Sequence, residues 1–140
     1  MRGYLLDTNI VSEPLRPRPD AGVLEGIRAA EGRMAIASVV WHELVYGVSR
    51  LPSSSRREKL ERYLRGHVAV ALEVLPYDTA AAAWHAVERA RLTGLGRTPA
   101  FADGQIAAIA ATRDLVLVTR NTADFASFAG LRVENWFTTA

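Results

Sequence analysis

The sequence predicts an α/β fold, with a mostly parallel central sheet of about five strands flanked by helices. Short apolar runs alternate along the chain with longer segments of helical period, which is typical of β–α–β units. No segment repeats or falls into low complexity. A chain of 140 residues that is 49% hydrophobic has the length and composition of one domain with a buried core. We therefore expect residues 1–140 to form a single domain.

The expected strands are five short apolar runs. Their sequences are GYLL, RMAIA, LEVL, LVLVT and LRVEN, at residues 3–6, 33–37, 72–75, 115–119 and 131–135. A continuous apolar run of this length is typical of a strand that is buried on both faces. Such strands need helices on both sides of the sheet.

The segments between these runs carry the start and stop signals of helices. After Ser38, a good N-cap, apolar residues recur at helical spacing from Val40 to Leu51. Thr98 and Pro99 are the expected opening of a later helix. We expect helices at residues 17–32, 38–51, 53–66, 78–94 and 98–114, and a short one after the last turn, within residues 118–130.

Composition excludes several classes of function. The chain has no cysteine, which excludes disulfides, thiolate zinc sites and cysteine nucleophiles. Its net charge is only +2, so a polyanionic partner would have to be held by local patches. There is no signal-peptide pattern, and the longest apolar run, MAIASVVW, is far below the roughly 20 residues that span a bilayer. We expect a cytoplasmic protein with no membrane contact.

Most of the 15 acidic residues lie in charged helix faces, but four do not. Asp7 directly follows the first strand, and open α/β sheets bind ligands beyond the carboxyl ends of their strands. Asp103 is followed at helical spacing by Ile106 and Ala110, which puts its carboxylate on a buried stripe. Each has a purely structural alternative. Asp7 or Asn9 could form an Asx turn or a cap, and a helix starting nearer to Asp103 would make that residue a cap.

The other two acids are Glu43 and Asp124. Glu43 borders the apolar stripe of the helix after Ser38, where an ordinary surface glutamate would also fit. Asp124 follows a strand and a turn, where Thr122 could cap a short helix whose dipole favours an acid. Because strand ends and helix starts of one parallel sheet meet at one edge, the four carboxylates would repel and raise their pKa values unless a cation neutralised them. Ligation by oxygen alone suits Mg²⁺ or Mn²⁺.

Four segments, in this order, resemble successive motifs of the PIN-domain ribonucleases, specifically VapC-type toxins of toxin–antitoxin pairs and their FitB-like relatives. They are LLDTNIVSEPLRP, SVVWHELVYGV, PAFADGQIAAIA and LVLVTRNTADF. The likeness runs nearly from end to end of the chain. By position, the acids of the family's site match Asp7, Glu43, Asp103 and Asp124. The polar residues that neighbour or support that site match Thr8, Asn9, Thr119 and Asn121.

The resemblance implies a metal-dependent endoribonuclease that hydrolyses RNA phosphodiester bonds. It implies that Mg²⁺ or Mn²⁺ is held mainly by Asp7 and Asp103, while Glu43 and Asp124 orient waters or hold a second ion. The implied substrate is single-stranded or looped RNA, often tRNA or ribosomal RNA, cut to leave a 5′-phosphate and a 3′-hydroxyl. The implied partners are a VapB-like antitoxin, a second copy of the chain in a homodimer, and a toxin–antitoxin hetero-oligomer.

Arginines are the expected contacts to RNA, because guanidinium groups bond phosphate in pairs and stack on bases. The densest basic stretch holds Arg50, Arg56, Arg57, Arg62 and Arg65, for which a solvated helix face is an equal alternative. Arg16 and Arg18 follow the first acid and are better placed.

One rival from another class stays open. A PIN-fold module without catalysis would act by binding a protein or a nucleic acid, and metal-dependent turnover of RNA distinguishes the two. Two enzyme-like rivals fail on their residues. A haloacid-type phosphotransferase needs an acid where this chain has Asn9, and a receiver-like domain needs a lysine from a late strand, whereas Lys59, the single lysine, lies in a charged helix.

Overall fold

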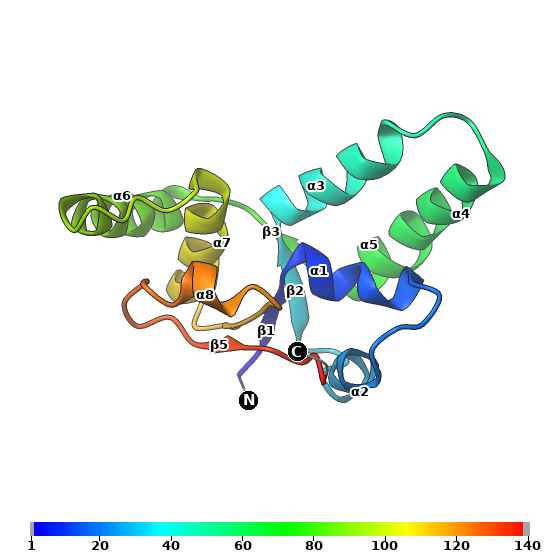
Figure 1. Ribbon diagram of the computed structural model, residues 1–140, viewed down its shortest axis with the longest axis horizontal. Coiled ribbons are helices and arrows are strands. Elements are labelled where there is room, and N and C mark those ends of the chain that lie inside the picture. Colours follow the sequence, from blue (N-terminus) through cyan, green and yellow to red (C-terminus); the bar gives the residue numbers. More distant parts are fainter. Residues whose placement is uncertain (1, 139–140) are drawn as a thin grey trace.

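A computed structural model describes residues 2–138, within which five strands form one sheet (Figure 1). Every neighbouring pair of strands is parallel, and the order across the sheet is β3-β2-β1-β4-β5. The strands are β1 (Tyr4–Leu6), β2 (Met34–Ala37), β3 (Glu73–Leu75), β4 (Val116–Val118) and β5 (Val133–Glu134). The prediction of an α/β fold with a parallel sheet of about five strands is confirmed.

Helices cover both sides of the sheet, as buried parallel strands require. Figure 1 shows α6 and α7 on one side, and α3, α4 and α5 on the other. The helices are α1 (Thr8–Val11), α2 (Ala21–Ala29), α3 (Ser38–Ser49), α4 (Ser55–Tyr63), α5 (Ala69–Ala71), α6 (Thr79–Gly94), α7 (Phe101–Thr112) and α8 (Thr122–Phe125). A 3₁₀ turn (Glu13–Leu15) follows α1, and a π-helical turn (Leu64–Val68) joins α4 to α5. No helix within residues 2–138 is long and apolar enough to cross a bilayer.

The strand order places a topological switch point at β1, which lies between β2 and β4. The chain runs from β1 outward to β2 and β3, then returns to β4 on the other side of β1. Leu6 is in register with Val118, and the backbone N–H of Asp7 donates to the Val118 carbonyl at 2.9 Å. The residues that follow β1 and β4 are therefore neighbours at the carboxyl edge of the sheet, where open α/β folds bind ligands.

Several helix boundaries differ from those expected. The helix α7 begins at Phe101 rather than at Thr98, whose hydroxyl pairs instead with that of Thr93 at 2.9 Å. Ser38 is the first residue of α3, and the extended Ala37 occupies the N-cap position. Likewise, Thr122 is the first residue of α8 and does not cap it. The one-turn helix α1 was not among the expected helices, but Asp7 caps it, which is one of the structural alternatives for this residue.

The helical path also continues past Gly66, where it was expected to end. Leu64 and Val68 are buried and lie four residues apart, with buried Leu72 four residues further on. Residues four apart move gradually around the surface of an α-helix, because it has 3.6 residues per turn. The wider π turn offsets this movement and keeps the three side chains on the buried face. Burial of these three side chains therefore outweighs the tendency of Gly66 to end the helix.

The packing of α6 against α7 depends on one glycine. A Cβ atom on Gly104 would lie 2.0 Å from Nε2 of His85, so the two helices approach closely only because residue 104 has no side chain. The His85 ring is buried, its Nδ1 is 2.8 Å from the Tyr77 hydroxyl, and Phe101 packs on it with 4.8 Å between ring centroids. Burial, and then the charge of Arg89, lower the pKa of His85, which favours the neutral ring.

We expect Gly104→Ala to destabilise the fold by about 1–3 kcal/mol, as other overpacked cores are. The matched control is Gly47→Ala in α3, where an added Cβ meets nothing within 4 Å. Removing a glycine from a helix interior there should stabilise by about 0.5–1 kcal/mol. Urea unfolding measures both changes. In a His85→Ala background, Gly104→Ala should cost nothing further, and an equal cost in both backgrounds would refute the assigned contact.

Candidate functional site

The carboxylate of Asp7 is held at the junction of β1 and α1. Asp7 is the N-cap of α1, and its Oδ1 accepts a hydrogen bond from the Thr8 backbone N–H at 2.8 Å. Its Oδ2 accepts from the Thr119 hydroxyl at 2.8 Å and from the Asn9 amide at 3.4 Å. Asp7 is only 8% exposed. Buried carboxylates need such donors, so this side chain has one fixed orientation.

A polar network behind Asp7 extends across to the end of β4. Thr119 is fully buried, and its hydroxyl oxygen accepts from the backbone N–H of Asn121 at 3.0 Å. The Asn9 side chain also reaches that hydroxyl at 3.4 Å, and its Oδ1 accepts from the Arg120 backbone N–H at 3.0 Å. The sequence-predicted supporting residues Thr8, Asn9, Thr119 and Asn121 are thus brought together around Asp7, two of them through their backbone N–H groups.

Asp103 is the second acid at this edge and belongs to the first turn of α7. Its side chain is half-buried, and burial raises the pKa of its carboxyl group. The negative charges of Asp124 and then Asp7 raise that pKa further. Asp103 is therefore close enough to two acids that are distant in the sequence for their charges to repel its own. The alternative that Asp103 caps this helix is wrong, because Ala100 occupies the N-cap position and no side chain caps the helix. The first-turn position does place the Asp103 carboxylate near the positive end of the helix dipole.

Asp124 and Glu43 are both exposed. Asp124 lies in the first turn of α8, where it faces the charge of Asp103. Glu43 lies on α3 and lines a cleft together with Thr8, the residue next to Asp7. Three of the four predicted acids thus belong to one group, in which the charges of Asp7 and Asp124 act on Asp103, and Glu43 lines the neighbouring cleft.

The donor chemistry of this group fits a hard divalent cation. Among residues 2–138, no three His, Asp or Glu side chains lie close enough together to hold an ion by themselves. Mg²⁺, however, keeps several waters and needs only one or two direct carboxylates. Oδ1 of Asp7 accepts a single hydrogen bond and keeps a free lone pair. A cation would also relieve the repulsion that raises the Asp103 pKa.

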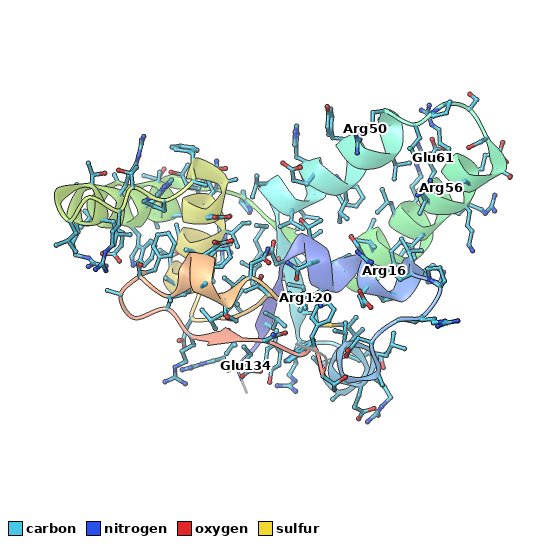
Figure 2. All side chains as sticks on the ribbon, viewed as in Figure 1. Arg16, Arg50, Arg56, Glu61, Arg120 and Glu134 are labelled. Carbon is cyan, nitrogen blue, oxygen red and sulfur yellow. The ribbon has the colours of Figure 1, made fainter. Side chains whose placement is uncertain are left out.

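A cleft of about 620 Å³ opens beside Thr8. Its walls come from α1, the 3₁₀ turn, α3 and α4, and its cationic lining residues are Arg16, Arg50, Arg56 and Lys59. Figure 2 shows Arg16, Arg50 and Arg56 on separate elements around the space between α3, α4 and the segment after α1. Lys59, which the charge pattern places on a solvated helix face, lies three residues after Arg56 and therefore on the same side of α4.

Comparison with known proteins identifies the family. The family model described as the PIN domain matches residues 4–131. The chain is 38% identical over 136 residues to the tRNA(fMet)-specific endonuclease VapC of Shigella flexneri, a match that covers 97% of this chain and 99% of that protein. It is 34% identical over 124 residues to the toxin FitB of Neisseria gonorrhoeae, covering 86% and 89% of the two chains. This chain belongs to the VapC/FitB family of PIN domains.

Solved structures of the VapC/FitB family share this fold. A structure of FitAB bound to a DNA fragment aligns with a TM-score of 0.87 and 30% identity, over 94% of each chain. The DNA-bound VapBC complex of Salmonella typhimurium aligns with a TM-score of 0.82 and 34% identity, over 97% of this chain and 99% of that one.

The two principal acids should respond in opposite ways to neutralisation in a metal-free buffer with EDTA. Asp7→Asn disturbs an acceptor of three hydrogen bonds and should destabilise by about 1–3 kcal/mol. Asp103→Asn removes a charge that two neighbouring carboxylates repel, so this variant should be as stable as wild type or more stable. Urea unfolding of the three proteins measures this difference. An Asp103→Asn protein as unstable as Asp7→Asn would contradict the assigned electrostatics.

Proposed function

We propose that this chain is a Mg²⁺- or Mn²⁺-dependent endoribonuclease and the toxin of a toxin–antitoxin pair. The proposal rests on the coupled carboxylates of Asp7, Asp103 and Asp124 at the carboxyl edge of a parallel sheet, beside an open cleft. The names of the relatives support it, because VapC of Shigella flexneri is named as a tRNA-specific endonuclease and FitB as a toxin. The substrate class that fits is RNA, with tRNA as the first candidate.

In this mechanism, Asp7 and Asp103 would hold the metal ion, and Glu43 and Asp124 would orient water molecules. A bound divalent ion would polarise the scissile phosphate and lower the pKa of a nearby water. Thr119 and Asn9 keep the Asp7 carboxylate in one orientation through their hydrogen bonds, so they are positioning residues. Asp124 and Glu43 are exposed, so both can accept hydrogen bonds from water, and Glu43 lines the cleft.

The purified chain, freed of any partner, should cut cellular RNA in Mg²⁺ or Mn²⁺ and stop in EDTA. Asp7→Asn and Asp103→Asn should each lower the rate by about a hundredfold or more, because loss of a partner behind a metal ligand already costs about 10–100-fold and each of these residues would be a ligand itself. Gel analysis of total RNA and mapping of new 5′ ends provide the readout. Equal cleavage with and without chelator would refute the metal mechanism. A chain that binds RNA but never cuts it would favour the non-catalytic PIN module.

Metal binding can also be measured without cleavage, because an ion that binds only the folded chain stabilises it. At about ten times the dissociation constant, one ion adds roughly 1.4 kcal/mol. For a chain of this length the melting temperature should rise by about 3–6 °C. Asp103→Asn should lose most of this rise, at the same protein concentration. A rise equal to wild type would exclude Asp103 as a principal ligand.

An antitoxin and a second copy of the chain are the partners we propose. The structural relatives include toxin–antitoxin complexes, such as VapBC of Salmonella typhimurium. The clustered acids offer a place for a basic side chain of an antitoxin segment that folds on binding. Exposed apolar side chains suit burial in a homodimer, with Tyr46 on α3 57% exposed and Phe101 at the start of α7 52% exposed.

Expression of the chain without an antitoxin should slow growth of its own host, and Asp7→Asn should relieve the effect. Co-expression with the cognate antitoxin should also restore growth, because the antitoxin blocks the acidic site. Growth curves at matched protein levels provide the measurement. A wild-type chain that is harmless at high expression in its own host would contradict the toxin assignment.

A further inference from the structure

The cleft beside Thr8 has a strongly uneven charge. Four of its lining side chains are cationic, namely Arg16, Arg50, Arg56 and Lys59, and one, Glu43, is acidic. The net charge of the whole chain is only +2, so this cleft concentrates positive charge that the rest of the surface balances. A local basic patch next to a candidate phosphodiesterase site is the feature that a polyanionic substrate requires.

Three of these cations make no ion pair within residues 2–138, unlike six arginines that do. One residue from Arg56, Arg57 pairs with Glu61 at 2.8 Å. Four more arginine–carboxylate pairs lie at other surface positions, at Arg2, Arg28, Arg91 and Arg113. Within residues 2–138 no carboxylate lies within ion-pair distance of Arg50, Arg56 or Lys59. Arg50 instead lies over the Tyr46 ring, at 5.9 Å from its centroid.

Arg16 differs from the other three. Its Nε lies 3.4 Å from the buried carboxylate of Glu13, yet the Arg16 side chain is 70% exposed. This contact holds the guanidinium group at the mouth of the cleft, on the wall opposite α3 and α4 (Figure 2). The positive charges therefore stand on both walls, with the apolar side chains of Leu15, Leu44, Val48, Leu51, Leu60 and Leu64 among the other lining residues.

We infer that this cleft binds single-stranded RNA next to the proposed catalytic acids, with Arg50, Arg56, Lys59 and Arg16 contacting its phosphates. The inference rests on the proposed function and assigns the substrate-binding residues of that site. Cations on both walls match a strand whose phosphates are reached from two sides. The apolar lining residues suit bases and riboses, which a single strand exposes and a duplex keeps stacked inside.

The basic residues of α4 and of the π-helical turn that follows it fall into two sets. Arg56 and Lys59 line the cleft, whereas Arg62 and Arg65 line a different surface depression together with Glu58 and Glu61. That depression holds as many carboxylates as arginines, although Glu61 pairs with Arg57, whereas the cleft holds four cations and one carboxylate. Arg62 and Arg65 therefore provide a matched control, because their removal changes the total charge by the same amount on the same helical segment.

The test is binding of a fluorescent single-stranded RNA of about 20 nucleotides in EDTA, where cleavage cannot occur, at several salt concentrations. Four phosphate contacts predict a slope of log affinity against log salt of about −2.8, and hence a roughly fiftyfold loss of affinity between 50 and 200 mM. Arg56→Ala/Lys59→Ala should reduce the slope to about −1.4 and this loss to about sevenfold. Arg62→Ala/Arg65→Ala should keep the slope of the wild type. Arg56→Lys retains the charge and should also keep it.

Melting curves establish that each variant is folded, which the exposure of Arg56, Lys59, Arg62 and Arg65 favours. The inference is overturned if the cleft variant keeps the wild-type slope, or if the control variant loses as much. It is also overturned if the cleft variant loses affinity for an acidic antitoxin segment but not for RNA. A wild-type chain that shows the expected slopes but cuts no RNA in Mn²⁺ would refute the proposed function and still support the binding cleft.

Discussion

The hydrogen bond from the Thr119 hydroxyl to Oδ2 of Asp7, 2.8 Å long, is the contact on which the arrangement of the site depends. It joins the ends of β1 and β4, two strands that are adjacent in the sheet, through residues that are 112 positions apart in the chain. The sheet order creates this contact, because β2 and β3 lie on one side of β1 whereas β4 and β5 lie on the other. Asp7 then serves two purposes, since the same carboxylate caps α1 and keeps a lone pair of Oδ1 free of any hydrogen bond to the described residues.

Among the acids of the site, Asp103 has the least favourable electrostatic environment. Its carboxyl pKa is raised by burial and by two like charges, whereas Asp7 is surrounded by donors. The close approach of α6 to α7, which Gly104 allows, leaves α7 little freedom to carry Asp103 away from these charges. Sites that bind cations commonly hold carboxylates close together on rigid elements. If the carboxylates could move apart, their negative charges would no longer be concentrated at one point, and the site would attract the ion less strongly.

The sequence was sufficient for the fold class and for the place of Asp7 at the carboxyl edge, because apolar runs mark the strands and Asp7 directly follows one of them. The expected place of Asp103 came from a buried helix stripe and from the family resemblance. It was less informative where tertiary contacts decide. The π turn results from the burial of Leu64 and Val68, and no local residue preference announces it. The start of α7 moved to Phe101 although Thr98 and Pro99 carry the usual opening signal. The inclusion of Lys59 in the cleft depends on where α4 packs, which a charge pattern does not encode.

The separation between the acids and the cleft cations has an evolutionary consequence. The acids Asp7, Asp103 and Asp124 follow strands of the sheet or open helices at its edge, whereas Arg56 and Lys59 lie on α4, which packs mainly against α3 and the π turn. Substitutions on the exposed face of α4 therefore leave the geometry of the sheet edge intact. Relatives could diverge in the RNA that they select while retaining one chemistry, because recognition and catalysis occupy parts of the fold that can mutate independently.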